Sequence, residues 1–145
     1  MPEPMNDFWG DLTVEASPAD VLHEQAEALG KRTKNVLEGM LLTDIANQVK
    51  WVHIRFAVHA PTLDYQTTLF ELSYSMLHPY PCSIRESLTE EEVTHEFEGQ
   101  SLKITNQKSR TVANEEQLHQ AVKEVLQSEN VQKLIKGLLG AARVS

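Results

Sequence analysis

The chain has 145 residues, a formal net charge of −8 at pH 7 and one cysteine. This length predicts a single domain that buries roughly 70% of the surface exposed by the unfolded chain, so its core needs neither disulfides nor a metal. A lone cysteine excludes an internal disulfide, and no apolar run is long enough to predict a membrane span, so we expect a cytoplasmic protein with no membrane partner.

The charges are distributed unevenly along the chain. Residues 1–30 contain seven acidic and no basic side chains, and residues 86–98 add six acidic ones. Basic residues are more frequent than acidic ones only after residue 98, apart from the small cluster Lys31, Arg32 and Lys34. Neither basic region is dense or interleaved with aromatic residues, so we do not expect nucleic-acid binding. The acidic balance suits either solubility or a basic protein partner.

Residues 1–16 are expected to form a mobile acidic tail, followed by a single α+β domain over residues 17–145. The tail carries the aromatic pair Phe8 and Trp9. These two side chains either dock on the domain or form an exposed binding tag, and we therefore retain both as candidate binding residues.

The domain is predicted to begin with a long helix over about 18–42. Ser17 is a suitable N-cap, Pro18 fits the first helical position, and Asp20 in the first turn interacts favourably with the helix dipole. Apolar residues and one threonine then recur at intervals of three and four, which is typical of a helix that packs on one face: Leu22, Ala26, Leu29, Thr33, Val36 and Met40.

Residues 50–60 and 65–76 are predicted to form two antiparallel strands joined by a turn at 61–64. The first strand alternates between an apolar face and a face that carries His53, Arg55 and His59. We treat these three as candidate binding residues on the outer face of the sheet, in a shallow groove or a dimer contact, although such faces are usually just solvated. His53 and His59 lie roughly 20 Å apart along a strand, so they cannot bind the same metal ion.

The stretch LHPYPC at 77–82 concentrates one histidine, two prolines and the cysteine. Proline cannot donate a ladder hydrogen bond, so we interpret the stretch as the connection between two strands, with Cys82 buried at the start of a third strand over 80–87. Further strand-like segments occur at 95–98 and 101–105, around Gly99.

Two helices are predicted at the C-terminal end. Asn114 is a suitable N-cap with Gln117 three residues later, and Ser128 precedes the last apolar stripe. The fold class is therefore α+β: a long N-terminal helix, an antiparallel meander of three to five strands, and two C-terminal helices packed on one sheet face.

Two classes of function are compatible with these features. The first is a small acidic, non-enzymatic protein-interaction or regulatory module, such as an adaptor, an immunity or antitoxin-like protein or a chaperone, which binds a protein partner or itself and needs no cofactor or metal. The alternative is a cysteine-dependent hydrolase or transferase with Cys82 as nucleophile, His78 or His59 as base, and Asp64 or Glu71 as the orienting acid. Binding of a small ligand between the helices and the sheet is a further possibility.

Overall fold

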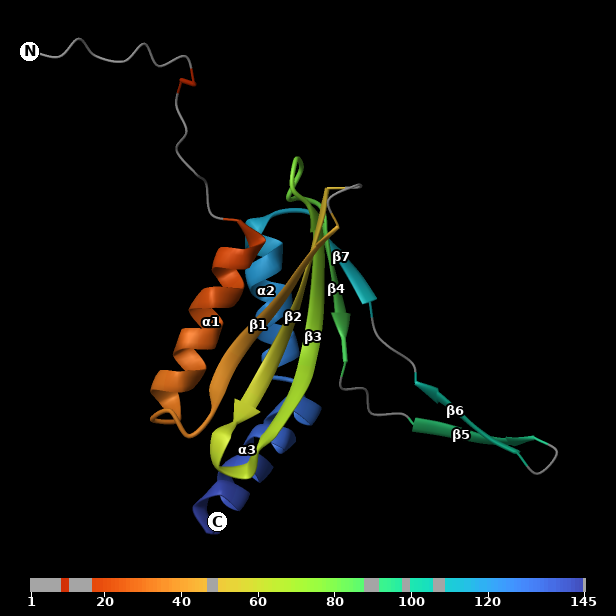
Figure 1. Ribbon diagram of the computed structural model, residues 1–145. Coiled ribbons are helices and arrows are strands. Elements are labelled where there is room, and N and C mark those ends of the chain that lie inside the picture. The colour runs from red at the N-terminus through yellow and green to blue at the C-terminus, as the bar shows by residue number, and fades with distance from the viewer. Residues whose placement is uncertain are drawn as a thin grey trace, which may run out of the picture.

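A computed structural model describes residues 9–10, 17–46, 50–87, 92–97, 100–105 and 109–144, with 92–97 and 100–105 described for their backbone. Its order is one helix, a series of antiparallel strands and two C-terminal helices (Figure 1). The predicted α+β class is thereby confirmed, including the C-terminal helices on the sheet.

Helix α1 spans Pro18–Arg32 and begins where the sequence predicts. The backbone N–H of Ser17 donates to the Asp20 carboxylate at 2.8 Å, which satisfies a donor at the helix start. The helix ends at Arg32, earlier than residue 42. Lys34 and Asn35 adopt left-handed conformations, with φ of 52° and 63°. These conformations are incompatible with a continuing right-handed helix, so the chain turns and enters a strand.

The main sheet has the strand order β1-β2-β3-β4-β7, and all its neighbouring strands are antiparallel. Its strands are β1 (Glu38–Ala46), β2 (Trp51–Ala60), β3 (Tyr65–Ser75), β4 (Cys82–Glu86) and β7 (Ser109–Val112). A single 3₁₀ turn, η1 (Pro61–Leu63), joins β2 to β3. Strands β5 (Glu92–Phe97) and β6 (Gln100–Thr105) form a separate two-stranded sheet between β4 and β7 in the chain.

Two details of the strands differ from the predictions. Alternation along 65–76 predicts Met76 on the buried face of β3, but the strand ends at Ser75 and Met76 is exposed. Strand β7 lies in a stretch that the sequence presents as a polar connection, and its only buried residue is Val112. A short edge strand with one buried side chain shows too little alternation to be recognised from its sequence.

The helices α2 (Glu115–Leu126) and α3 (Glu129–Val144) lie on the same face of the sheet as α1 (Figure 1). Between helices and sheet is the core, where the rings of Phe56 and Phe70 stack with centroids 5.1 Å apart. Both rings are buried, and each contributes on the order of 2–3 kcal/mol by its removal from water.

The opposite face of the sheet is not covered by any described helix (Figure 1). His53, Arg55 and His59 point to this open face, whereas Val52, Ile54 and Phe56 point to the helices and are buried. The alternation predicted for this strand therefore correctly separates its two faces.

Candidate binding groove

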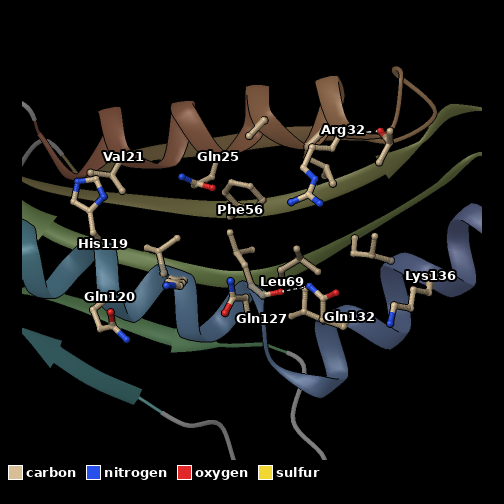
Figure 2. A pocket seen from close by; sticks show the side chains of 18 of the residues that line it. Val21, Gln25, Arg32, Phe56, Leu69, His119, Gln120, Gln127, Gln132 and Lys136 are labelled. Carbon is tan, nitrogen blue, oxygen red and sulfur yellow. Dashed lines mark hydrogen bonds between the residues drawn. The ribbon is translucent and has the colours of Figure 1, made fainter.

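A groove with a volume of about 820 Å³ runs between α1 on one side and α2 with α3 on the other (Figure 2). Phe56 of β2 and Leu69 of β3 form its floor. The walls are formed by residues of the three helices and by the residues that directly follow α1 and α2: Val21, Gln25, Ala28, Leu29, Arg32, Thr33, Glu116, His119, Gln120, Val122, Lys123, Leu126, Gln127, Val131, Gln132, Ile135, Lys136 and Leu139.

The groove is long because it follows the helices. Its lining residues on α1 extend from Val21 to Arg32, which corresponds to about 17 Å at the helical rise of 1.5 Å per residue. The facing wall changes from α2 to α3 along this length. Where the two helices meet, the Gln132 side chain donates a hydrogen bond to the Leu126 carbonyl at 2.8 Å. This contact lies where the wall passes from α2 to α3.

The inner part of the groove is apolar. Its floor residues are almost completely buried, while Leu29 and Leu126 on opposite walls are only partly buried, as are Ile135 and Leu139 further along α3. Apolar side chains that are partly exposed on both walls of a concave surface can be removed from water by a bound ligand. The groove therefore provides a hydrophobic contact area for an occupant.

The rim of the groove is polar and carries mainly positive charge. Three lining residues are cations, namely Arg32, Lys123 and Lys136, whereas Glu116 is the one lining carboxylate. Figure 2 shows Arg32 and Lys136 on facing walls toward one end of the groove, and His119 toward the other. Within the described part of the chain, none of the three cations forms an ion pair.

The candidate nucleophile Cys82 is enclosed in the core. Its side chain is 2% exposed, and burial raises its pKa from an ordinary value of 9.0 to about 11. A thiol in this environment is protonated at neutral pH and inaccessible to a substrate.

The residues proposed to assist Cys82 are not assembled around it. His59 lies on the open face, with its Nδ1 3.2 Å from a Glu38 carboxylate oxygen. The neighbour of Cys82 in β4, Ser83, pairs with Ser73 of β3, which pairs with His53 of β2, and His53 is six residues or about 20 Å from His59 along the strand. His78 is exposed in the loop after β3 and forms no side-chain hydrogen bond or ion pair with any described residue.

Neither of the two candidate acids lies with Cys82 in the core. Asp64 ends the η1 turn between β2 and β3, and Glu71 belongs to the open face, where its carboxylate lies 3.6 Å from the His53 imidazole. The arrangement thus gives no geometric support to a thiol–imidazole pair. Among the described residues, no group of three or more His, Cys, Asp or Glu side chains has a metal-binding arrangement.

The candidate binding residues on the open face have polar cross-strand neighbours. His53 Nδ1 lies 2.7 Å from the Ser73 hydroxyl, and Arg55 is opposite Glu71 in the register. Such pairs stabilise a solvated sheet face without forming a concave site. Trp9 is 78% exposed, and Phe8 lies outside the described residues.

The groove was not predicted as a specific set of residues. Its polar lining residues belong to the flanks of three amphipathic helices, and in sequence these flanks are indistinguishable from ordinary solvated helix faces. These residues line one groove only because of the way in which α1, α2 and α3 are placed on the sheet.

No protein-family model matches the chain, and no curated protein or solved structure is significantly similar to it. In the described residues, none of the helices combines the length and the apolar character required to cross a membrane. The groove therefore has to be interpreted from its own geometry.

Proposed function

We propose that the protein is a non-enzymatic protein-interaction module that holds a segment of a partner protein in the groove between α1 and α2 with α3. The groove itself is the observation that carries this proposal. An adaptor, an immunity or antitoxin-like protein and a chaperone all act through a contact with another protein, and such a contact is the common element of these roles.

The dimensions of the groove favour a chain segment. A helix of about twelve residues, or an extended stretch of about six, spans the 17 Å over which α1 lines the groove. Recognition of an amphipathic helix in an apolar groove uses side chains spaced along such a length. The apolar floor and partly exposed leucines supply contact area, while the polar rim can set the orientation of the segment.

A compact small ligand is the main alternative, since a volume of 820 Å³ lies within the range of roughly 300–1,000 Å³ that is typical of such sites. Small-molecule sites, however, usually surround most of the ligand and place a few polar groups around it. Here the polar side chains come from all three helices and are spread along the length of the groove (Figure 2). This distribution suits a polymer better than a compact molecule.

Site-specific photo-cross-linking tests the proposal. A photoreactive phenylalanine analogue replaces Gln25, which lines the groove, or Glu24, its exposed neighbour on α1 outside the groove, in the full chain expressed in the cells that produce it. We expect a covalent adduct with a second protein from position 25 and none from position 24. Adding Ala28→Trp, which fills the groove with a large side chain, should abolish that adduct.

Two results would contradict the proposal. Equal cross-linking from positions 24 and 25, or adducts that persist in the Ala28→Trp protein, would place the partner elsewhere on the surface. A small molecule retained by the native protein in mass spectrometry, released by Ala28→Trp and accompanied by no protein adduct, would assign the groove to a small ligand.

A further inference from the structure

We propose that the partner segment is an acidic amphipathic one, whose apolar side chains enter the groove and whose carboxylates contact Arg32, Lys123 and Lys136. This inference rests on the proposed function and specifies the chemistry of the occupant. It is carried by the charge of the groove, which is opposite in sign to that of the protein.

The charge of the groove differs in sign from the net charge of the whole chain. The whole chain has a formal net charge of −8, yet its groove is lined by three cations and one carboxylate. An acidic segment is attracted by the cations of the groove, where the low-dielectric apolar floor weakens solvent screening. The positive charge of the groove therefore favours an acidic occupant over a neutral or basic one.

Local helix stability does not explain all three cations. Arg32 is in the last turn of α1 and Lys123 in the last turn of α2, where positive charges interact favourably with the helix dipoles. Lys136, however, lies in the middle of α3, far from either end of that helix. Its position opposite Arg32 across the groove is explained instead by a shared anionic partner (Figure 2).

The distribution of charge also predicts at which end of the groove the carboxylates of the bound segment lie. Glu116 and His119 come from the first turns of α2, at the end of the groove marked by Val21, whereas Arg32 and Lys136 lie toward the opposite end (Figure 2). The carboxylates of the segment should consequently be concentrated at the end that lies between Arg32 and Lys136. Its apolar residues should be spaced along the remaining length.

Selection from a random peptide library tests this chemistry even while the partner is unidentified. A library of sixteen-residue peptides displayed on phage is selected against the immobilised full chain at low ionic strength, and every enriched peptide is measured by fluorescence anisotropy against variants. We expect groove-dependent peptides, defined by loss of binding to Ala28→Trp, to carry a net negative charge and a row of apolar residues.

Charge reversal in the groove should weaken these peptides selectively. The double variant Arg32→Glu with Lys136→Glu should bind them at least about tenfold more weakly, because two attractive contacts become repulsive. The control is Lys31→Glu with Arg143→Glu, which makes the same two charge reversals on the same helices at exposed positions outside the groove. The control should bind them within about twofold of the unmodified chain, since exposed charges away from the site are screened.

The possible failures are distinguishable. If no enriched peptide is sensitive to Ala28→Trp, the proposed function itself fails. A second outcome is that groove-dependent peptides are found but are neutral or basic, or bind the Arg32→Glu, Lys136→Glu variant as tightly as its control. The groove would then bind peptides, but the proposal that its occupant is acidic would be wrong. If position 25 cross-links only to residues 1–16 of the same chain, the proposal that a separate protein occupies the groove is also wrong.

Discussion

Gly39 of β1 packs directly against Ala26 of α1, so closely that a Cβ atom at position 39 would lie 2.5 Å from the Ala26 Cα. The contact is between a strand and the backbone of a helix, neither of which can move away independently. It therefore determines how near α1 lies to the sheet. Because α1 is one wall of the groove, this contact also sets the position of that wall.

The Gly39→Ala substitution should destabilise the protein. The added methyl group forces α1 away from β1, and overpacking of this kind costs about 1–3 kcal/mol of the free energy of unfolding. Gly137→Ala is the matched control, since a Cβ at this helical position meets nothing within 4 Å and should stabilise by about 0.5–1 kcal/mol. Urea denaturation followed by circular dichroism measures both. Equal effects at the two positions would show that the close approach is not rigid.

The same contact explains why the end of α1 could not be predicted from the sequence. The apolar residues between 36 and 41 fit helical spacing as well as strand alternation, since Leu37, Gly39 and Leu41 also lie two residues apart. The choice between them depends on the left-handed turn at Lys34 and Asn35 and on the packing of a glycine against a helix. The second of these is a tertiary feature that no local pattern contains.

Features with a local cause were predicted correctly. The N-terminus of α1, the two faces of β2 and the capped start of α2 each depend on neighbouring residues in the chain. The groove depends on the distance between three helices that are far apart in sequence. Side chains such as Arg32 and Lys136 are consequently indistinguishable in sequence from ordinary solvated residues, and only the packing of the helices sets them apart.

The thiol of Cys82 should be unreactive in the folded protein. Its pKa of about 11 leaves about one hundredfold less thiolate at pH 8 than an ordinary value of 9.0 would, and its side chain is 2% exposed. Iodoacetamide at neutral pH should therefore modify it only after unfolding in urea, as measured by intact mass. Rapid modification of the folded chain, together with loss of a measurable hydrolase or transferase activity, would support the cysteine-enzyme alternative.

Burial of Cys82 should also make the stability of the protein depend on alkaline pH. The pKa is raised in the folded state, so the folded chain retains a proton that the unfolded chain releases above about pH 9. The stabilisation is fully present below pH 9 and is lost as the pH rises toward 11, by up to about 2–3 kcal/mol. Denaturation of the unmodified chain and of Cys82→Ala at pH 8 and pH 10.5 should show a smaller decrease for the variant. An identical pH dependence in both proteins would contradict this assignment.

The open face of the sheet should tolerate substitution. His53, Arg55 and His59 have polar cross-strand partners and are partly exposed to solvent, so replacing each by alanine should cost less than about 1 kcal/mol. Sedimentation velocity should show the same coefficient for these variants as for the unmodified chain. A change from dimer to monomer on Arg55→Ala would instead identify this face as a contact between two copies.

Asn114 should be important for the wall formed by α2. Its side-chain oxygen accepts a hydrogen bond from the Gln117 backbone N–H at 2.8 Å, and the Gln117 side chain in turn accepts one from the Ala113 N–H at 3.0 Å. Loss of an N-cap of this type costs about 1 kcal/mol, so Asn114→Ala should lower the free energy of unfolding by about that amount.

The effect should be greatest at the start of α2, because the first turn depends on the cap. Glu116 and His119 belong to this part of the helix and line the groove, so fraying there should increase amide hydrogen exchange at residues 115–119 more than at residues 120–126. Asn114→Asp retains an acceptor oxygen and adds a charge that is favourable at a helix N-terminus, so it should restore protection. If Asn114→Asp exchanges as fast as Asn114→Ala, the side-chain acceptor is not what holds this end of the groove in place.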